Sequence, residues 1–561
     1  MTTPREIDLT VGQRRQVGWW RSAKSAPAAG PEAMRNAMQH LRHPVYVVND
    51  NGRQAVAQDG EAVLGAGDDP KPGSYPLMGY VPVLAPEQLG DPSFRTAHGL
   101  RYAYIAGAMA NGISSVEMVR ALGRAGMIGF FGAGGLELPQ IETALELTQS
   151  EPGDQPYGFN LLYSPNDPQW EAALVDLYLS RGVHLISASA YLDLSLPLIR
   201  YRVSGIRQLP NGQVVAPHKV IAKVSRVEIA RRFFSPPPAE MLSQLVQSGT
   251  ITAEEARLAN TIPVAEDLTA EADSGGHTDN RPALALLPTM LALRDEMMSR
   301  HNYTADLRVG AAGGIATPES AAAAFGMGAA YILTGSINQA CRESGSCDTV
   351  RRMLAEAGQA DVVMAPAADM FEMGVKVQVL KRGTMFAIRA RKLYELYRNY
   401  GTISELPAAQ RRLLERDYFR CTLDEAWEQT RSYFAARDPE QVERADRDPK
   451  HKMALVFRSY LGQSSNWANR GEPSRQVDYQ IWCGPAMGAF NEWVCDTWLA
   501  APERRDVVSV ALNLLVGAAV VTRAGWLRAQ GVSLPLAAQR FAPCERHELA
   551  ELLDEDSREA G

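Results

Sequence analysis

Short apolar runs alternate with amphipathic segments through the middle of the chain, between about residue 101 and residue 336. Each run is continuously apolar, which is typical of parallel strands whose two faces are both buried. The amphipathic segments between the first strands predict helices at residues 114–126, 139–150 and 170–181, the first capped by Ser114. The runs themselves predict eight strands, at residues 102–107, 127–132, 157–164, 183–189, 218–225, 264–271, 307–312 and 329–335. Strand–helix units of this number and length match one (β/α)8 barrel.

A doubly wound open sheet is the alternative arrangement for alternating strands and helices. Its dinucleotide-binding form would place the pattern G-x-G-x-x-G directly after the first strand. The sequence there is GAMANG, at residues 107–112, which does not fit that pattern. We therefore predict an α/β fold whose main domain, residues 81–360, is a (β/α)8 TIM barrel.

The two ends of the chain follow other patterns. Residues 1–80 predict a small N-terminal α/β unit, with a helix at residues 31–41 and a hairpin around an Asn-Gly turn at residues 51–52. Residues 404–442 are charged and helical in pattern and the following residues are helical too, so we predict a mainly α C-terminal domain at residues 361–561. Its most apolar stretch, residues 507–521, is too short to span a bilayer comfortably.

One unit of the predicted barrel is longer than the others. Residues 231–262, between the fifth and sixth predicted strands, contain two short helices after three successive prolines. An insertion on the catalytic face of a barrel often covers the active site, so we predict a helical lid here. A surface elaboration with no part in the site is the alternative.

The composition limits the classes of function. With 561 residues the chain exceeds one ordinary domain, and its net charge of −7 disfavours a nucleic-acid partner. Its six cysteines show no CxxC spacing, so we expect neither a metal site nor a disulfide framework. The first residues lack the apolar core of a secretory signal. These features predict a soluble, cytoplasmic protein without a membrane partner.

Three glycine-rich turns follow the last three predicted strands, and each is expected to open into a helix. Backbone N–H groups at such turns stabilise an anion. The loops after strands 7 and 8 form the phosphate site of many (β/α)8 barrels. These turns therefore predict a phosphate-bearing cofactor. Their residues are Gly275, Gly276 and His277, then Ala312, Gly313 and Gly314, then Gly335 and Ser336.

Two cofactors fit a phosphate site on a barrel. Pyridoxal phosphate needs a Schiff-base lysine and a partner for its pyridine nitrogen. Lys223 could be that lysine, but nothing in the sequence indicates the partner. FMN fits better, because Gly107, Ala108 and Met109 end the first strand and would let the backbone approach a flat ring. Asn160 would then bond the flavin carbonyl edge, and Lys223 would place positive charge near N1 as a catalytic group. A tight turn, a loop cap and a paired lysine are the structural alternatives.

His277 is the most distinctive single residue, since it ends the Ser-Gly-Gly-His turn and the chain has only nine histidines. Near a flavin it could supply a proton to a substrate or donate a hydrogen bond to a thioester carbonyl. A purely structural histidine is the alternative. Glu271, Asp273 and Asp279 lie close in sequence, and one of them could orient His277 or raise its pKa.

Several long motifs resemble one known family over residues 19–531. They include PYGFNLLYSPN, TAEADSGGHTDNRP, RVGAAGGIATPES and DYQIWCGPAMGAFNEW. These motifs are similar to those of the PfaD family, the stand-alone enoyl reductases of polyunsaturated fatty acid and polyketide synthases. That family belongs to the FMN-dependent barrels that include 2-nitropropane dioxygenase.

The resemblance implies FMN as the bound cofactor and NADPH as the reductant. It implies reduction of the 2,3 double bond of an enoyl chain carried by an acyl carrier protein. The Gly-Gly-His turn of the superfamily matches the turn that ends at His277. Its Ala-Gly-Gly phosphate turn matches residues 312–314, and its Gly-Ser/Thr turn matches residues 335–336.

Two other functions stay open. A nitronate monooxygenase is disfavoured because Ala108 stands where the nitronate-oxidising relatives commonly have a proline before the methionine. A non-catalytic scaffold of a synthase complex would not need the intact glycine turns. The sequence leaves open whether the product is a fatty acid or a polyketide, whether NADPH or NADH is used, and whether the chain forms a homodimer.

A carrier protein should present an acidic surface, so an acidic enzyme needs a local basic patch to bind it. The segment KRGTMFAIRARKLYELYR supplies such a patch. A solvated helix face is the alternative explanation of these charges. The basic residues are Lys381, Arg382, Arg389, Arg391, Lys392 and Arg398.

Overall fold

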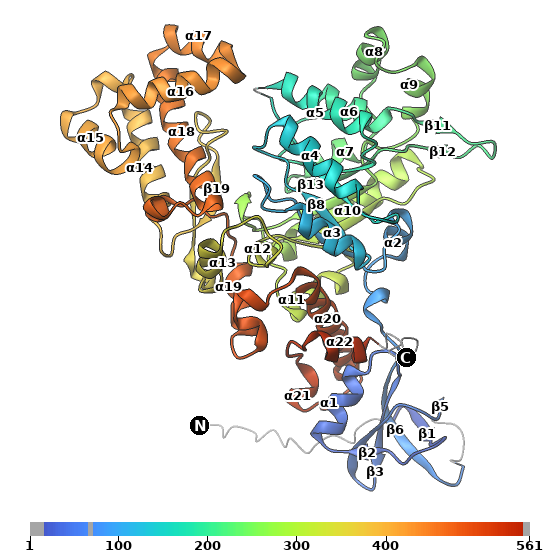
Figure 1. The fold of residues 1–561 in the computed structure, drawn as a ribbon. Helices are drawn as coiled ribbons and strands as arrows, with labels where there is room; N and C mark the ends of the chain where they lie inside the picture. The colour runs from blue at the N-terminus through green and yellow to red at the C-terminus, as the bar shows by residue number, and fades with distance from the viewer. Residues whose placement is uncertain (1–15, 66–70, 166, 554–561) are drawn as a thin grey trace, which may run out of the picture. The chain divides into compact units, whose positions relative to one another are not determined.

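The computed structural model describes residues 16–65, 71–165 and 167–553 and divides into two compact units (Figure 1). The barrel unit comprises Gly90–Ala316 and Met327–Val508. The terminal unit comprises the described residues up to Leu89, the segment Thr317–Gly326 and the described residues from Ser509 onward.

The barrel unit contains a closed parallel barrel of eight strands, so the predicted fold is confirmed. Neighbouring strands in the barrel are also successive in the chain, and β17 pairs with β7 to close it. The observed strands are shorter than the predicted ones: at their carboxyl ends residues such as Gly107 and Gly335 belong to the turns, and at their amino ends apolar residues such as Val264 and Ala265 precede the strand. The strands are β7 (Tyr104–Ala106), β8 (Ile128–Phe131), β9 (Gly158–Leu162), β10 (Leu185–Ser189), β13 (Lys219–Val224), β14 (Asp267–Glu271), β16 (Arg308–Ala312) and β17 (Ile332–Thr334).

Helices cover the barrel strands and bury one apolar face each. Ser115, not Ser114, caps the first helix after β7, because the Ser115 hydroxyl accepts the N–H of Met118. The helices are α2 (Pro92–His98), α3 (Val116–Arg124), α4 (Leu138–Gln149), α5 (Pro168–Ser180), α6 (Leu196–Val203), α7 (Val227–Phe233), α10 (Ala283–His301), α12 (Ser336–Gln339) and α13 (Asp348–Ala355).

A buried ionic cluster closes the amino ends of the strands. Asp267 and Arg308 are paired first residues of β14 and β16, and their side chains meet at 2.6 Å (Nε to Oδ1). His98 Nε2 lies 2.8 Å from the other Asp267 oxygen. Burial alone would raise the pKa of Asp267, but His98 and Arg308 outweigh it and hold that pKa well below its usual value. This end of a barrel serves stability rather than catalysis.

The long insertion is not placed as a lid, which corrects the prediction for residues 231–262. Its helices, α8 (Ala239–Gln247) and α9 (Ala253–Ala259), pack against α6, and α9 contacts the hairpin of β11 (Arg207–Gln208) and β12 (Val214–Val215). Because α7 follows β13, it carries the chain back toward the amino ends of the strands before α8 begins. Figure 1 shows α8 and α9 well separated from β19 (Lys376–Leu380).

A small antiparallel sheet extends from the carboxyl end of the barrel. Its order is β15-β19-β18, with β15 at Gly276–His277 and β18 at Val362–Pro366. The Gly-Gly-His turn therefore does not open into a helix as predicted. It forms β15 instead, with His277 opposite Val377 of β19.

A helical region follows this sheet within the barrel unit. The helices α14 to α18 share one apolar core, in which Phe457, Leu461 and Leu393 are fully buried, whereas α19 packs against α12 and α13. Asp448 caps α18 by accepting the N–H groups of Lys450 and His451. The helices are α14 (Phe386–Asn399), α15 (Ala408–Leu413), α16 (Leu423–Arg437), α17 (Pro439–Arg447), α18 (Pro449–Arg470) and α19 (Ala486–Val494).

The terminal unit is built on a six-stranded antiparallel sheet in the order β2-β4-β3-β6-β1-β5. The predicted hairpin is present as β3 and β4, because Asn51 and Gly52 both adopt the positive φ values that a tight hairpin turn requires. The elements are β1 (Gly18–Arg21), β2 (Ala28–Ala29), α1 (Pro31–Gln39), β3 (Val45–Asp50), β4 (Arg53–Ala57), β5 (Glu61–Leu64), β6 (Ser74–Val81) and α11 (Pro318–Gly326).

Helix α20 (Val507–Ala529) supplies the core of the terminal unit, so the predicted single α domain at residues 361–561 is divided between two units. Its Ala524 and Leu527 pack with Met34 and Met38 of α1. The helix has 23 residues, longer than predicted and long enough to cross a membrane, but 78% of its most apolar window is buried in the protein. The last helices are α21 (Leu536–Gln539) and α22 (Arg546–Leu552).

Candidate functional site

A narrow cavity of about 90 Å³ lies where the carboxyl ends of the barrel strands meet. It gathers most of the residues that the sequence singled out. Those lining it are Gly107, Ala108, Met109, Lys223, Gly275, Ala312, Gly313, Gly314, Gly335 and Ser336, together with Glu271, Ser274, Gln339, Trp482 and Ala486. Asn160, Gly276 and His277 are not among the lining residues.

The two turns after β16 and β17 form a cradle with open space beside the backbone. Gly313 and Gly314 both have positive φ values, +84° and +75°. A Cβ on Gly313 would lie 2.6 Å from the carbonyl carbon of Ala272, so only glycine lets this turn pack against the end of β14. A Cβ on Gly314 or Gly335 would meet no atom within 4 Å. The free space lies beside the N–H groups that the phosphate of a cofactor would need, so the residues present fit a phosphate.

A buried polar network holds the turn after β17 in place. The Tyr104 hydroxyl lies 2.6 Å from Thr334 Oγ1, and Asn338 Nδ2 donates to the Thr334 carbonyl at 3.1 Å. Tyr104 also donates to Asn338 Oδ1 at 3.2 Å, and its burial raises the pKa of the hydroxyl. These bonds fix the strand end that leads directly into Gly335 and Ser336. No pattern in the sequence pointed to this network.

The turn after β7 is held by Ser114, the residue that was expected to cap a helix. The Ser114 hydroxyl donates to the Gly107 carbonyl at 2.8 Å and accepts the N–H of Met109 at 3.0 Å. The Gly107 N–H donates to the Thr334 carbonyl at 2.9 Å. A Cβ on Gly107 would lie 2.6 Å from Leu333 Cδ2, which explains the glycine. Residues 107–109 therefore present a fixed stretch of backbone to the cavity.

Lys223 lies in the cavity wall and forms an ion pair with Glu271. Ser274 Oγ donates to the same Glu271 oxygen at 3.2 Å. The side chains of Lys223 and Glu271 are 19% and 15% exposed, so the pair faces the cavity rather than bulk solvent. The ammonium group has three protons, so it can donate to a further acceptor in the cavity while it stays paired.

Asn160 has the structural role that was weighed against flavin binding. Its side chain is buried, and its Oδ1 accepts the N–H of Ala133 at 2.7 Å. Its own carbonyl accepts the Tyr178 hydroxyl at 2.9 Å. The amide oxygen therefore ties β9 to the loop after β8, and only the amide nitrogen could reach a ligand.

His277 is paired with a residue that was not expected from the sequence. Its Nε2 lies 3.2 Å from Oδ1 of Asp369, in the loop between β18 and β19. Burial works against protonation of the ring, but the hydrogen bond to Asp369 and the charge of that carboxylate outweigh it and raise the pKa of His277. The ring is 39% exposed, so a substrate can approach it.

The three carboxylates of which one was expected to orient His277 or raise its pKa all bind other groups. Asp273 accepts a hydrogen bond from Gln378 Nε2 at 2.9 Å, and Asp279 accepts one from Arg226 Nε at 3.0 Å. Glu271 binds Lys223, although its charge also contributes a smaller upward effect on the pKa of His277. The predicted orienting role belongs instead to a residue 92 positions downstream of the histidine.

A segment from the helical part of the chain completes the cavity wall. A Cβ on Gly275 would lie 2.9 Å from the Gly484 nitrogen, so the two backbones are in direct contact. The Gly484 N–H donates to Ser336 Oγ at 3.1 Å. Trp482 lines the cavity and pairs with Val379 of β19. The glycine and tryptophan in WCGPAMG were the available signal for this contribution.

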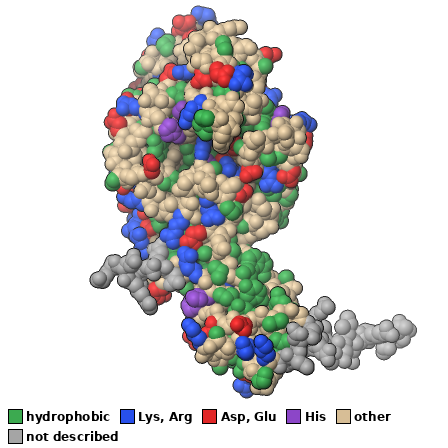
Figure 2. Space-filling model, turned by 90° about the vertical axis from the view of Figure 1, so that its right-hand side faces the viewer, with side chains coloured by type: hydrophobic (Ala, Val, Ile, Leu, Met, Phe, Trp, Pro, Cys, Tyr) green, Lys and Arg blue, Asp and Glu red, His purple; other side chains and the backbone are tan. Residues whose placement is uncertain are grey.

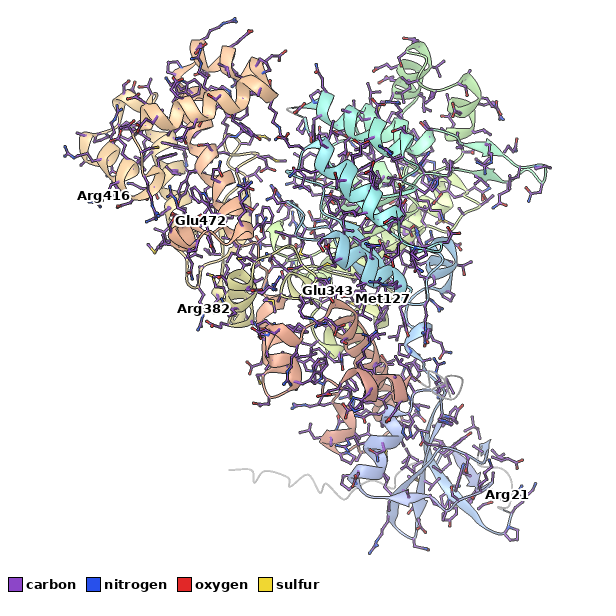
Figure 3. All side chains as sticks on the ribbon, viewed as in Figure 1. Arg21, Met127, Glu343, Arg382, Arg416 and Glu472 are labelled. Atoms are coloured by element: carbon purple, nitrogen blue, oxygen red, sulfur yellow. The ribbon has the colours of Figure 1, made fainter. Side chains whose placement is uncertain are left out.

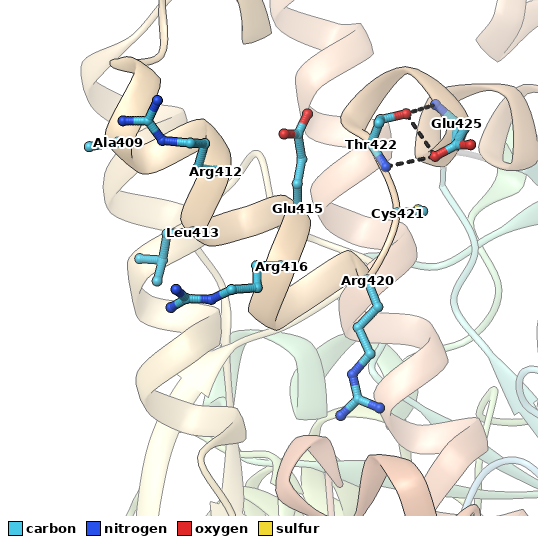
Figure 4. Close-up of a pocket in the computed structure, with 9 residues that line it drawn as sticks. All are labelled: Ala409, Arg412, Leu413, Glu415, Arg416, Arg420, Cys421, Thr422 and Glu425. Carbon is cyan, nitrogen blue, oxygen red and sulfur yellow. Dashed lines mark hydrogen bonds between the residues drawn. The ribbon is translucent and has the colours of Figure 1, made fainter.

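A larger hollow, of about 890 Å³, lies on the helical region (Figure 4). Its lining residues all come from one stretch, residues 409–425. Its two glutamates are already bound, Glu415 by Arg411 at 3.0 Å and Glu425 by the Thr422 N–H at 2.8 Å. Active sites of barrels draw residues from several strand ends, which the small cavity does and this hollow does not.

Comparison with known proteins gives two family profiles that match successive parts of the chain. The profile described as nitronate monooxygenase matches residues 94–396. The profile described as the inserted helical domain of [acyl-carrier-protein] S-malonyltransferase matches residues 400–479.

Individual relatives agree with these profiles. The chain is 46% identical over 447 residues to a component of the polyunsaturated fatty acid synthase of Thraustochytrium sp., and 46% identical over 439 residues to the polyketide biosynthesis protein PksE of Bacillus subtilis. Each match covers 78% of this chain, but only 30% and 57% of those proteins. The crystal structure of the enoyl reductase domain of MlnA, from the macrolactin biosynthesis cluster of Bacillus amyloliquefaciens, aligns with a TM-score of 0.74 at 42% identity. That alignment covers 79% of this chain and 99% of the domain.

Proposed function

Because this chain belongs to the nitronate monooxygenase family and, within it, to the PfaD-like enoyl reductases, we propose that it is an FMN-dependent enoyl reductase. Its substrate is the 2,3-unsaturated thioester of an acyl carrier protein, and NADPH is the reductant. The observation that carries the proposal is the cradle at Gly314 and Gly335, which opens into the same cavity as Lys223.

The residues of the cavity suit FMN. The N–H groups of Gly314, Gly335 and Ser336 would hold its phosphate, and the backbone at residues 107–109 would lie against its ring. When bound, FMN supplies the hydride-transfer chemistry that no side chain can supply. Lys223 contributes positive charge near the ring, held in position by Glu271 and, through it, by Ser274. A charge fixed in advance in a cavity of low polarity is worth more than one in water.

In this proposal His277 is the proton or hydrogen-bond donor to the substrate, and Asp369 stabilises its protonated form. Reduction of an enoyl thioester places negative charge on the thioester oxygen and requires a proton at the α-carbon. A protonated His277 can donate a hydrogen bond to that oxygen or deliver that proton. Asp369 stabilises the protonated ring, so a larger fraction of His277 carries the proton near neutral pH. The antiparallel pairing of β15 with β19 fixes the backbone of the histidine.

The substrate class rests on the relatives. Their names place them in the synthesis of polyunsaturated fatty acids and polyketides, and the helical profile is named after an enzyme that acts on the acyl carrier protein. We take the carrier protein as the partner of this chain on those grounds.

Steady-state turnover tests the proposal. The protein, loaded with FMN, is given NADPH and crotonyl-N-acetylcysteamine, a small enoyl thioester, and the expected result is NADPH oxidation that depends on the thioester. Mass spectrometry should show a product that is heavier by two hydrogen atoms. Oxygen uptake with a nitroalkane, without reduction of the thioester, would instead identify a nitronate monooxygenase. Protein-bound FMN that NADPH cannot reduce would indicate a non-catalytic scaffold.

A further inference from the structure

The outer face of α14 exposes large apolar side chains. The inner face of this helix is buried through Phe386, Ala390 and Leu393. On the outside, Met385, the residue just before the helix, is 43% exposed, and Ile388, whose N–H donates to the Met385 carbonyl at 3.1 Å, is 57% exposed. Residues three apart are neighbours on a helix surface, so these two side chains form one apolar patch. Such a patch with a polar rim is typical of a protein interface.

Basic residues flank this apolar patch in the sequence. Between residues 381 and 398 the chain carries six basic residues and one acidic residue, in a protein whose net charge is −7. Lys381 and Arg382 precede the patch, and Arg391 and Lys392 follow it one helical turn later. By contrast, acidic and basic side chains are interspersed on the face shown in Figure 2.

Two arginines of the predicted basic patch differ in their availability. Arg389 forms an ion pair with the buried Asp478, so it is part of the core and is removed from the patch. Arg382 is 54% exposed and lies 3.7 Å from Asp361 and 3.9 Å from Glu356, distances of weak surface pairs. Figure 3 shows Arg382 at the outer edge of this unit.

This surface is joined to the candidate site by a short, rigid connection. Val377 lies opposite His277, and Lys381 follows four residues later, about 13 Å along the strand direction at a rise of about 3.3 Å per residue. The Met385 N–H donates to the Val477 carbonyl at 2.7 Å, five residues before Trp482 in the cavity wall.

We propose that Met385 and Ile388, together with the flanking Lys381, Arg382, Arg391 and Lys392, form the docking surface for the carrier protein. The inference rests on the proposed function, because that function supplies the partner. Its occupant is an acidic helix of the carrier domain, whose apolar residues cover Met385 and Ile388 while its carboxylates face the four cations. The complementary charges speed encounter and fix orientation, and the apolar pair supplies the buried contact.

The arginines of the larger hollow offer a matched control. Arg416 is 75% exposed but is held by Asp417 at 2.7 Å, and Figure 3 also shows it at the outer edge of the unit. The charge reversal Arg416→Glu changes the net charge of the protein by as much as Arg382→Glu alone, at a site outside the proposed surface, so the single variant Arg382→Glu is measured beside the double one. Comparison with the double variant Lys381→Glu/Arg382→Glu and with Ile388→Ser separates docking from a general effect of charge.

The test measures KM and kcat of the FMN-loaded enzyme with crotonyl-acyl carrier protein and with crotonyl-N-acetylcysteamine. The double charge reversal should raise KM for the carrier-bound substrate by about tenfold or more at low salt, with less effect at high salt. It should leave KM for the small thioester, and kcat for both substrates, unchanged. Ile388→Ser should also raise KM only for the carrier-bound substrate. Arg416→Glu should leave KM and kcat for both substrates unchanged.

Three results would overturn the docking surface: equal effects on both substrates, an unchanged KM with the carrier, or a larger effect from Arg416→Glu. Failure of the proposed function has a different signature, because wild-type enzyme would then reduce neither substrate. In that case binding of the enoyl-carrier protein, measured by calorimetry with the same variants, still decides whether this surface receives it.

Discussion

Gly335 lies at the amino end of α12. Its replacement by alanine is expected to weaken cofactor binding without changing the stability of the fold. Its φ of −130° lies outside the left-handed region, and a new Cβ would meet no atom within 4 Å. The variant Gly335→Ala should therefore unfold with a free energy within about 0.5 kcal/mol of the wild type. The added methyl group would, however, occupy the space proposed for the FMN phosphate.

The size of the effect on binding follows from the bond that is lost. A hydrogen bond from an N–H group to a charged partner contributes about 1.5–3 kcal/mol. Its loss would weaken FMN binding roughly 10- to 150-fold. Titration of apoprotein with FMN, followed by quenching of flavin fluorescence, gives the dissociation constant, and thermal denaturation of the apoprotein gives the stability.

Gly462→Ala is the matched control, because Gly462 lies in α18 and also has no atom within 4 Å of a new Cβ. That variant should bind FMN as the wild type does. If Gly335→Ala binds FMN with unchanged affinity, the phosphate does not lie in the cradle. If its apoprotein is strongly destabilised while Gly462→Ala is not, the space beside Gly335 is needed by the fold rather than by a ligand.

Three further substitutions test the account. Asp369→Asn removes the carboxylate that raises the pKa of His277, so the alkaline limb of the kcat/KM profile should move to lower pH; an unmoved limb would exclude His277 as the titrating group. Asp267→Asn leaves buried Arg308 without its carboxylate and should cost about 3–5 kcal/mol in denaturant unfolding. Since the folded-state pKa of Asp267 lies below its unfolded value of about 3.9, its contribution is present above that pH and is lost as the pH falls through the folded pKa, and the variant should lack this acid dependence. Tyr104→Phe removes the hydroxyl that contacts Thr334 and Asn338, and it should weaken FMN binding without moving the pH profile; unchanged affinity would separate this network from the cofactor.

The barrel could be predicted because its strands are buried on both faces. A run such as residues 102–107 has no polar alternation, and the following turn has to be glycine where backbones approach closely. The sequence singled out Gly313 as part of a phosphate turn and Gly107 as the end of the first strand; the structure adds that a Cβ would collide with Ala272 at Gly313 and with Leu333 at Gly107. Steric requirements of this kind are local, so they are visible in the sequence.

Contacts between distant segments could not be predicted in the same way. Asp369 binds His277 although 92 positions separate them in the sequence. Gly484, which follows α18 in the sequence, packs on Gly275. No local pattern distinguishes Asp369 from Asp273, which lies nearer in sequence but binds Gln378. The role of the insertion at residues 231–262 was misjudged because α7 had already returned the chain to the other end of the barrel.

The terminal unit shows a second limit. The apolar length of α20 is evident from the sequence, but the partner that buries it is not. Its side chains pack with α1, almost 500 residues earlier in the chain, and Arg523 donates to the carbonyls of His40 and His43 there. A division of the chain by composition at residue 361 therefore missed this pairing.

The central claim is tested most directly by the visible spectrum of the FMN-loaded protein without oxygen, recorded before NADPH, after NADPH and after a stoichiometric enoyl thioester. The account predicts that the flavin band bleaches with NADPH and returns when the thioester is added, with one saturated thioester formed per flavin. A band that bleaches and returns only when air is admitted, with either the small thioester or the carrier-bound one, would contradict an enoyl reductase.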